Sequence, residues 1–444
     1  MSTAMSRTAL SRTGMSRTGL SRRGFLLGAA SLGAIPILSS CVGSGSGEGP
    51  AASGGGATTL TLQSSIQDAG PKAALEKVVG GFTGPQTTLN SVATEQFRAQ
   101  LSTYLSSATP PDVLAWYAGS VANTYAAEGL LLDVSDLWAP GGACAGFSDA
   151  LRALSTSSDG KAIFVPTSYY WWSIFYKKSA FAEWGVRPPT TWDDFIALCD
   201  DLKARGIHPL TNGIGSTAWM SAGWFDYLNL RINGAEYHRA LLAGQHSFED
   251  PQVTAVLEQY ARLIPYFHPN QTSWDAQQAV TPMVNNEAAM YLVGAFCVQY
   301  FPQDQQDDLD FFSVPTIDPA VPTAEEAPTD GFFAAANSQN PEGAKELLSY
   351  LASAPAQQQY ITDSGSSNLP TSPDVDTSGF SPLVQKGIQL LNSTAEITQF
   401  FNRDSSDALQ TTADAALTQF IADPSDIRGV QRQWQQAAQQ VFSS

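Results

Sequence analysis

Short apolar runs alternate with longer amphipathic stretches along most of the chain. Residues 59–62 alternate polar and apolar side chains, as in a strand, and residues 112–116, an aspartate followed by four apolar residues, are typical of a buried strand. At Thr191 a helix is predicted to start, because Thr191 can cap it and Asp194 stands three residues later. The apolar side chains that follow at helical spacing are Trp192, Phe195, Ile196, Cys199 and Leu202. Strands that alternate with helices predict an α/β fold.

The N-terminal forty residues have a different pattern. They carry five arginines and no acidic residue, and an apolar stretch runs from residue 25 to 38. These fourteen residues are too few to span a bilayer, which needs about 20. We therefore interpret residues 1–40 as a signal peptide. Ser21–Leu26 resembles a twin-arginine export signal, although general export stays open. The start codon is also open between Met1, Met5 and Met15.

The signal peptide ends in a pattern that predicts an anchor. Leu38–Cys41 resembles a bacterial lipobox, in which the cysteine is lipidated after cleavage. Residues 41–59 are rich in glycine, serine and alanine, which favours a flexible tether. We therefore expect an exported protein, lipid-anchored through Cys41 to the outer face of the cytoplasmic membrane.

Charge and composition exclude several partners. The chain has 23 lysines and arginines against 41 acidic residues, a net charge of −18. Binding to nucleic acid needs cationic side chains that neutralise phosphates, so we expect no nucleic-acid partner. With 4 histidines and 4 cysteines, neither a metal site nor a cofactor is expected. Cleavage before Cys41 leaves three cysteines, of which at most one pair can form a disulfide, and the sequence does not say which: Cys144, Cys199 and Cys297.

Enzymatic signatures are few. The sequence holds no G-x-G-x-x-G, Walker A, H-E-x-x-H or G-x-S-x-G motif. Asp193 and Asp194 could be taken for a glycosidase pair, but such carboxyl groups flank one bond at about 5 to 9.5 Å. Adjacent residues of a helix point in different directions, so we expect no enzyme.

Large aromatic residues gather where strands are predicted to end. Trp116 and Tyr117 follow one buried strand, and residues 169–172 are Tyr-Tyr-Trp-Trp after another. Ligands of open α/β sheets bind at the carboxyl ends of strands. A sugar ring packs its apolar C–H face on an aromatic plane, and its hydroxyl groups need polar partners. Candidate polar partners are Gln63, Glu95, Asp226, Asn229, Arg231, Asp330, Arg403 and Asp404.

Several stretches in order resemble one family. Residues 110–117, Pro-Pro-Asp-Val-Leu-Ala-Trp-Tyr, and residues 128–134, Glu-Gly-Leu-Leu-Leu-Asp-Val, resemble signatures of family 1 extracellular solute-binding proteins. Residues 165–170, 175–178 and 188–195 are similar to the hinge and the following helix of that family. Residues 287–294, Glu-Ala-Ala-Met-Tyr-Leu-Val-Gly, resemble its A-A-M-x-x-x-G turn. The order agrees from about residue 60 to residue 359.

The resemblance implies a fold and a division of the chain. Family members are two-lobed α/β proteins of the periplasmic-binding-protein type II class, with a ligand cleft between lobes joined by hinge strands. The first lobe is expected to comprise residues 60–172 and 315–354, and the second residues 173–314 and 355–444.

It also implies a role and a set of ligand-binding residues. Trp116 would be the stacking platform of the first lobe, Tyr170 and Trp171 would lie at the hinge, and Trp224 and Phe296 would line the second lobe. Together with the polar candidates, the expected set is Gln63, Glu95, Trp116, Tyr117, Tyr170, Trp171, Trp224, Asp226, Gly294, Phe296, Asp330, Gly331, Phe401, Arg403 and Asp404.

Proteins of this family are carbohydrate receptors that deliver sugars to ABC importers. By resemblance we expect a monomeric sugar-binding lipoprotein, similar to maltose-binding proteins, with permease subunits of the membrane as partners. The aromatic content favours an oligosaccharide ligand. Two alternatives stay open, a sensing or adhesion receptor on the same scaffold and a secreted glycoside hydrolase.

Overall fold

The computed structural model describes residues 59–443. The predicted signal peptide, the lipidation site Cys41 and the tether up to residue 58 lie outside this part of the chain. None of the helices between residues 59 and 443 combines the length and hydrophobicity that a membrane span requires.

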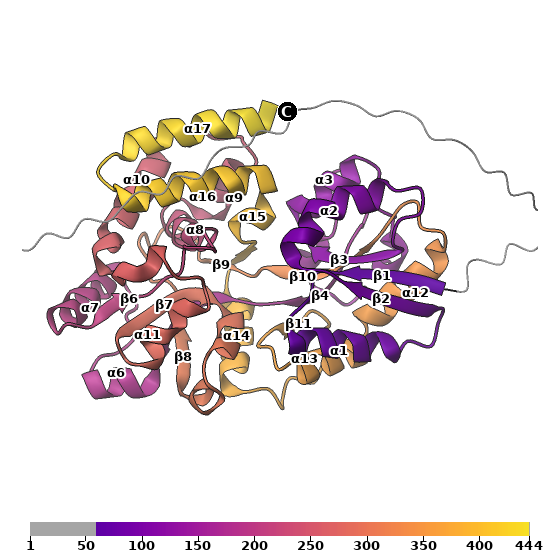
Figure 1. Cartoon of the computed structure of the whole chain (residues 1–444), viewed down its shortest axis with the longest axis horizontal. Helices are drawn as coiled ribbons and strands as arrows, with labels where there is room; N and C mark the ends of the chain where they lie inside the picture. The colour runs from indigo at the N-terminus through magenta and orange to yellow at the C-terminus, as the bar shows by residue number, and fades with distance from the viewer. Residues whose placement is uncertain (1–58, 444) are drawn as a thin grey trace, which may run out of the picture. The chain divides into compact units, whose positions relative to one another are not determined.

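Six strands form the larger sheet, in the order β11-β4-β10-β3-β1-β2 (Figure 1). Their bounds are β1 Thr59–Ser64, β2 Gln86–Ser91, β3 Val113–Tyr117, β4 Val165–Tyr169, β10 Thr329–Ala334 and β11 Leu369–Pro370. β1 is parallel to β2 and β3, whereas β10 is antiparallel to β3 and β4. The strands predicted at residues 59–62 and 112–116 are thereby confirmed as β1 and β3.

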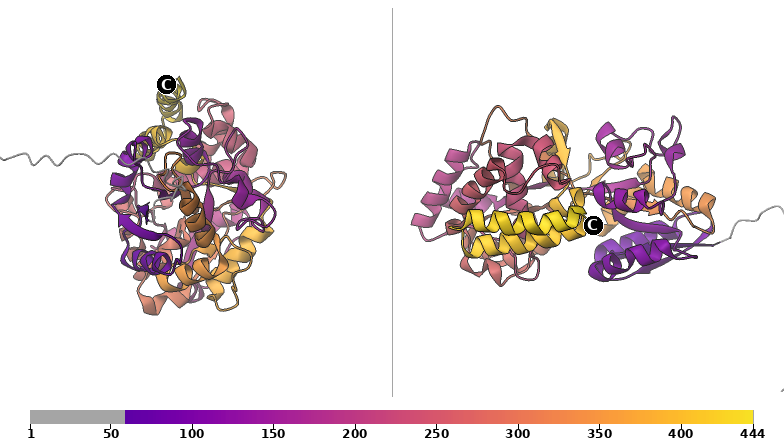
Figure 2. Two further views of the ribbon diagram at one scale, coloured as in Figure 1. Left: turned by 90° about the vertical axis from the view of Figure 1, so that its right-hand side faces the viewer. Right: turned by 90° about the horizontal axis from the view of Figure 1, so that it is seen from above.

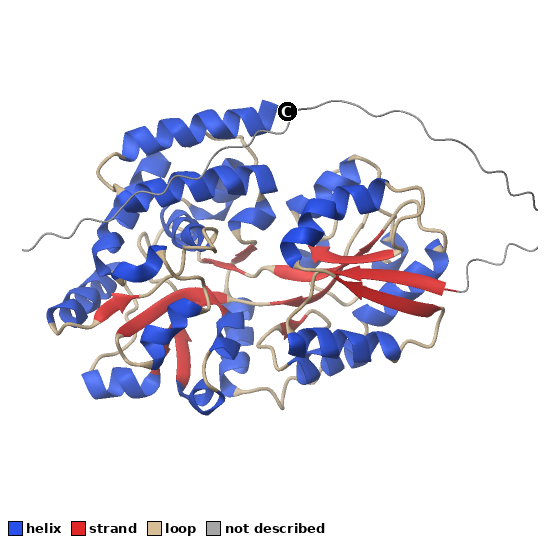
Figure 3. Ribbon diagram, in the orientation of Figure 1, coloured by secondary structure: helices blue, strands red, loops and turns tan. Residues whose placement is uncertain are grey.

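Helices cover both faces of this sheet (Figure 3). They are α1 Ala69–Gly80, α2 Thr94–Ser106, α3 Ser120–Ala127, α4 Ser135–Trp138, α5 Asp149–Leu154, α12 Pro341–Ala352 and α13 Ala354–Ser364. α1 buries Leu75, Val78 and Val79 in the same apolar cluster as Leu351 and Ala356. Burial of this face, rather than intrinsic propensity, is what stabilises such short helices.

The second sheet has four strands in the order β6-β7-β5-β8. They are β5 Trp172–Lys177, β6 His208–Leu210, β7 Ala288–Gly294 and β8 Leu309–Phe312. β5 and β7 are buried along their whole length, as expected for strands covered on both faces.

Helices surround the second sheet and run to the end of the described chain. They are α6 Lys178–Trp184, α7 Trp192–Ala204, α8 Met220–Ile232, α9 Gly234–Leu242, α10 Pro251–Leu263, α11 Thr281–Val284, α14 Pro382–Ser393, α16 Asp407–Ala422 and α17 Ile427–Ser443. Short 3₁₀ turns lie at Ile264–Tyr266, Pro269–Thr272, Gln278–Val280, Ala295–Tyr300 and Gln303–Asp308. The helix start predicted at Thr191 is confirmed, because the Thr191 hydroxyl accepts a hydrogen bond from the Asp194 backbone N–H at 3.2 Å. α16 and α17 pack against each other (Figure 2).

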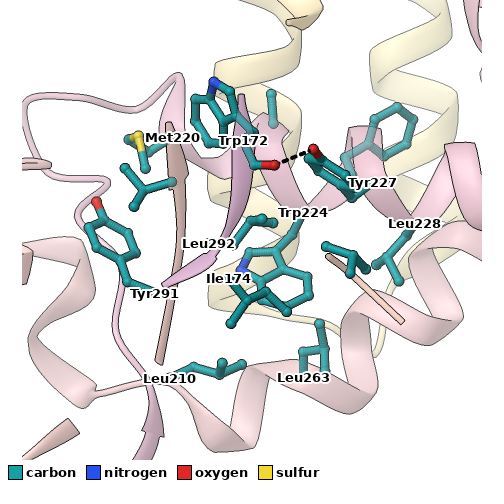
Figure 4. Packing of buried hydrophobic residues seen from close by; sticks show 14 of the residues in the cluster. Trp172, Ile174, Leu210, Met220, Trp224, Tyr227, Leu228, Leu263, Tyr291 and Leu292 are labelled. Carbon is teal, nitrogen blue, oxygen red and sulfur yellow. Dashed lines mark hydrogen bonds between the residues drawn. The ribbon is translucent and has the colours of Figure 1, made fainter. Parts of the chain in front are cut away.

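The core around the second sheet is rich in aromatic rings. Trp224 of α8 packs on the rings of Phe195 and Phe267 and against aliphatic side chains next to β5 (Figure 4). The Tyr227 hydroxyl donates a hydrogen bond to the Trp172 carbonyl at 2.7 Å (Figure 4). The helix α8 is buried on nearly every side, so it forms the centre of this half of the molecule.

A third, two-stranded sheet pairs β9 Ala324–Glu326 with β12 Glu396–Thr398 in parallel. β9 leads directly into β10, and β12 is followed by the short helix α15 Phe401–Asp404. This sheet therefore connects the segments that carry Asp330 and Arg403.

The chain between residues 354 and 370 differs from expectation. We expected residues 355–444 to accompany the second lobe, but α13 packs on α1 and β11 pairs with β4 of the six-stranded sheet. The reason is that Ala356 of α13 shares a core with Leu75 and Leu351. The resemblance to the family fades at residue 359, so the sequence carried little information about this segment.

Candidate functional site

A cavity of about 290 Å³ opens at one edge of the six-stranded sheet. The segment Ser65–Asp68 follows β1, Tyr117 ends β3, and Ser168 lies near the end of β4. Because β10 runs antiparallel, its first residues reach the same edge, where Asp330 pairs with Tyr117. Carboxyl ends of strands are where ligands of α/β sheets bind.

Three other segments complete the wall. Phe296 and Gln299 come from the turn after β7, so the second sheet also contributes to the cavity. Arg403 enters from α15, and Tyr360 and Asn368 enter from α13 and the loop after it. The cavity is therefore built where the two sheets and the connecting segments meet.

Arg403 is the centre of a polar network in this cavity. Its Nη1 donates to Asp330 Oδ1 at 2.7 Å and its Nη2 donates to the Tyr170 hydroxyl at 3.1 Å. Its guanidinium also lies 3.9 Å from the centroid of the Tyr117 ring. A guanidinium stacked over a ring keeps its N–H groups in its own plane, where they can reach acceptors beside the ring.

Burial and charge act against each other in this network. Burial raises the pKa of Asp330, and the neighbouring Arg403 lowers it in part. Burial also raises the pKa of the Tyr170 hydroxyl, which stays protonated. The pKa of Arg403 is raised despite its burial, chiefly by Asp330. Arg403 is thus a permanent cation beside a carboxylate that keeps 32% of its side chain exposed.

Aromatic rings form the neighbouring wall. Trp116 stacks on Phe97 at 5.0 Å and on Tyr117 at 4.3 Å. These contacts leave Trp116 only 3% exposed, and its indole Nε1 has no hydrogen-bond partner among the described residues. In this conformation Tyr117, rather than Trp116, presents the larger aromatic surface toward Arg403.

The chemistry of the wall fits an uncharged, hydroxyl-rich ligand. Carboxylate, amide and hydroxyl groups lie beside flat aromatic surfaces, and the permanent cation already has Asp330 as its partner. An anionic ligand would have to displace that partner. Besides Arg403, Asp330, Tyr117 and Tyr170, the polar side chains that line the cavity are Ser65, Gln67, Asp68, Thr94, Thr167, Ser168, Gln299, Gln357, Tyr360, Ser366 and Asn368.

The structure brings part of the expected set together. Seven of the expected residues line the cavity: Trp116, Tyr117, Tyr170, Phe296, Asp330, Gly331 and Arg403. Gly294 lies directly behind them, because a Cβ atom there would come within 2.5 Å of the Phe296 ring and 2.9 Å of the Tyr170 ring. Glycine at this position is what allows those two rings to approach the strand end.

Three expected aromatic residues lie in the core instead of at the cavity. Trp171 packs on Phe175 and Phe311. Trp224 packs on Phe195 and Phe267, and Phe401 packs on Phe225 and Trp434. Each is at most 1% exposed, so its contribution in this conformation is to packing.

The remaining polar candidates also serve internal contacts. Asp226 accepts the Phe401 N–H at 2.9 Å, and Asp404 accepts the Gln399 N–H at 3.0 Å. Gln63 is buried in β1.

Two further candidates pair within the second half of the molecule. Arg231 forms an ion pair of 2.6 Å with Glu325, and Asn229 contacts His238 at 3.0 Å. Glu95 lies in α2, and its side chain is outside the described part of the structure.

Some cavity residues were not anticipated. Gln67 and Asp68 follow the first predicted strand closely, so the rule used for Trp116 and Tyr117 could have found them. Tyr360 and Asn368 could not be found in this way, because their place depends on α13 packing against α1.

The described residues offer neither a cluster of metal ligands nor an exposed thiol. Among residues 59–443, no three histidine, cysteine or acidic side chains gather to hold a metal ion. Cys144, Cys199 and Cys297 are buried free thiols, and burial raises the pKa of each of them.

Comparison with known proteins gives a consistent result. A sequence model of the family described as bacterial extracellular solute-binding protein matches residues 64–358. The alpha-glucosides-binding periplasmic protein AglE of Rhizobium meliloti is 24% identical over 340 residues, which are 71% of this chain and 72% of AglE. An ABC transporter extracellular-binding protein of Pyrococcus horikoshii is 24% identical over 296 residues. This match covers 64% of each chain, slightly less than two thirds of the relative's length.

Solved structures agree in fold. The bacterial solute receptor AcbH, whose structures are described as revealing a substrate preference for β-D-galactopyranose, superposes with a TM-score of 0.79. It is 30% identical, and the match covers 86% of this chain and 99% of AcbH. A chitin oligosaccharide binding protein superposes with a TM-score of 0.75 at 20% identity, over 87% of this chain and 99% of its own. These neighbours are two-lobed α/β proteins, as expected for this chain.

Proposed function

We propose that this chain, which belongs to the bacterial extracellular solute-binding proteins, is a carbohydrate receptor that delivers its ligand to an ABC importer. The observation that carries the proposal is the position of the Arg403–Asp330–Tyr170 network beside the Tyr117 ring, in a cavity walled by both sheets. An aromatic face and a planar polar network side by side are what a pyranose ring requires.

The size of the cavity favours a small sugar. Ligand pockets for drug-sized molecules range from about 300 to 1,000 Å³, and this cavity of about 290 Å³ lies just below that range. We therefore propose a single pyranose as the ligand, in place of the oligosaccharide that the aromatic content favoured. The preference described for AcbH makes D-galactose the first sugar to test.

Binding is proposed to work by closure of the two halves on the sugar. Tyr117 and Asp330 belong to the six-stranded sheet, whereas Phe296 follows a strand of the second sheet. A sugar that contacts both sets binds the closed form more tightly and shifts the population toward it. The permease would then recognise the closed form.

We propose binding without catalysis. Asp330 is engaged by Arg403, and glycoside hydrolysis needs two carboxyl groups that are free to act on one bond. The relatives named above are described as binding proteins and receptors.

The proposed location follows from the N-terminal sequence. Export with removal of residues 1–40 and lipidation at Cys41 would hold a monomeric receptor on the outer face of the cytoplasmic membrane. Replacing Cys41 by serine should abolish the incorporation of labelled fatty acid and release the protein into the medium; labelling that persists in Cys41→Ser would contradict this anchor.

The binding function is tested by calorimetric titration with D-galactose, D-glucose, maltose and raffinose. We expect one-to-one binding of a monosaccharide with a Kd of about 1 μM or tighter, equivalent to about 8 kcal/mol, and recovery of the intact sugar. Absence of binding to every sugar would contradict the proposal, and products of hydrolysis would indicate an enzyme.

A further inference from the structure

Two carboxyl groups meet in the interior behind the cavity. Asp226 of α8 and Glu326 of β9 are both 0% exposed, their elements pack on each other, and the two carboxyl groups lie close enough to act on each other. Two ionised carboxylates offer only acceptors, so this contact needs a proton on one of them. No donor from any other described residue reaches Asp226 Oδ1 or either carboxyl oxygen of Glu326.

The cations around the pair are engaged elsewhere. Arg231, on the same helix as Asp226, is paired with Glu325 at 2.6 Å and donates to the Val314 carbonyl at 2.8 Å. Its charge is thus already balanced by another carboxylate.

The histidine beside the pair is neutral. Burial lowers the pKa of His238 to about 3. Its Nδ1 faces the Asn229 amide, and its Nε2 lies 3.9 Å from Asp226 Oδ1, which is too long for a hydrogen bond.

The other charges near the pair work against its ionisation. Asp404 of α15 and Glu325 of β9 act on Glu326 as negative neighbours. Arg239 of α9 is paired with Glu396 and acts on Asp404 rather than on the pair. A shared proton is therefore the means available within the described chain to hold both carboxyl groups in this site.

The pair is attached to both partners of the cavity network. Asp226 Oδ2 accepts the Phe401 N–H at 2.9 Å, and Phe401 begins α15 two residues before Arg403. Glu326 ends β9, four residues before Asp330. The two carboxyl groups thus connect α8 to the short helix that carries the cation and to the strand that carries its counter-ion.

We propose that Asp226 and Glu326 share one proton, and that the protonated pair fixes the start of α15 and so positions Arg403 in the cavity. They are positioning residues, because neither lines the cavity. The proposal depends on the proposed function only in that Arg403 is there to serve a ligand.

The sign of the pH dependence follows from the raised pKa values of both groups, which burial causes first. The contact between them raises the pKa of Glu326 further and lowers that of Asp226 in part. The folded state binds a proton that the unfolded chain releases near the ordinary carboxyl pKa values of about 4. Stability contributed by the pair is therefore greatest at acidic pH and falls as the pH rises toward the raised pKa. Once the proton is lost, two buried negative charges repel each other and α15 loses its anchor.

The test is hydrogen exchange of the Phe401 amide in the purified protein without ligand, measured across pH and corrected for intrinsic rates. In the wild type we expect protection at acidic pH that falls by about tenfold or more as the pair ionises, as for loss of one hydrogen bond to a charged group. Asp226→Asn should keep protection at every pH, because its amide supplies both an acceptor for Phe401 and a permanent donor for Glu326.

A control variant, a second variant of the pair and an infrared measurement accompany the exchange experiment. Asp414→Asn removes another carboxyl whose pKa burial raises to about 6, and it should leave the Phe401 profile unchanged. Glu326→Gln should remove the pH dependence as Asp226→Asn does. The wild type should show an infrared carbonyl band of a protonated carboxyl that Asp226→Asn and Glu326→Gln lose.

A wild-type pH profile in Asp226→Asn, or an unchanged carboxyl band in both variants, would overturn the shared proton. If the Phe401 amide of the wild type loses protection at alkaline pH while the sugar affinity of the wild type stays the same, the link to Arg403 would be overturned. Because exchange and infrared need no ligand, failure to find a sugar in the panel would count against the proposed function and leave this result standing.

Discussion

Two groups of aromatic residues in this protein have opposite surroundings. The cavity group, Tyr117, Tyr170 and Phe296, lies beside Arg403 and the open space of the cavity. The core group, Trp171, Trp224 and Phe401, is enclosed by other rings. Tyr170 and Trp171 are adjacent in sequence and belong to different groups. An aromatic cluster at a strand end therefore indicates where a site lies, but the direction in which each side chain points decides which residues form it.

The largest expected effect is the loss of stability when a residue of the core group is truncated. Trp171→Ala should lower the free energy of unfolding by about 3–5 kcal/mol, because it opens a cavity between β5, β8 and α14. The packing is close enough that a Cβ atom on Gly387 would lie 2.5 Å from the indole ring. Chemical denaturation measures this loss, and Trp171→Phe should recover more than half of it. A cost below about 1 kcal/mol would remove Trp171 from the core group.

Arg403 should have the next largest effect, and on ligand binding. Arg403→Ala should weaken sugar binding by about 2–4 kcal/mol, because it leaves Asp330 without its counter-ion and removes a donor next to the ligand. Calorimetry measures the change. Arg403→Lys should recover only part of the affinity, since an ammonium group does not stack and fork as a guanidinium does.

A matched control separates this effect from loss of charge. Arg262 is exposed and bonds to Gln259 away from the cavity, so Arg262→Ala should leave affinity unchanged. Equal losses in both variants would mean that net charge, not the network, governs binding.

Tyr117 should have an intermediate effect. Tyr117→Ala should weaken sugar binding by about 1–3 kcal/mol through loss of aromatic surface. Tyr117→Phe keeps the ring and should bind nearly as the wild type does. If affinity is unchanged in Tyr117→Ala, the ring does not contact the sugar.

The smallest expected effect belongs to the Tyr170 hydroxyl. Tyr170→Phe removes one acceptor of Arg403 and should cost about 0.5–1.5 kcal/mol in affinity, without loss of stability greater than this. The same titration measures it. A loss as large as that of Arg403→Ala would mean that the hydroxyl itself binds the sugar.

Much of this arrangement could be predicted from the sequence. The strands at residues 59–62 and 112–116, the helix start at Thr191 and the cavity position of Trp116 and Tyr117 follow from local patterns and from the rule that ligands meet strand ends. These features depend on residues close together in the chain, which is why periodicity and capping reveal them.

The rest depends on contacts between distant segments. Asp226 is a buried partner of Phe401, 175 residues further along the chain, and nothing in its local sequence distinguishes it from a ligand-binding carboxylate. The placement of α13 and β11 on the six-stranded sheet likewise follows from packing against α1, which no local pattern shows.

The most direct measurement is the crystal structure of the protein with the sugar that binds most tightly in the titration panel. We predict a single pyranose in the cavity, with its ring against Tyr117 and its hydroxyl groups within hydrogen-bond distance of Asp330 and Arg403. A sugar bound elsewhere on the protein, or one that contacts neither Asp330 nor Arg403, would contradict the account.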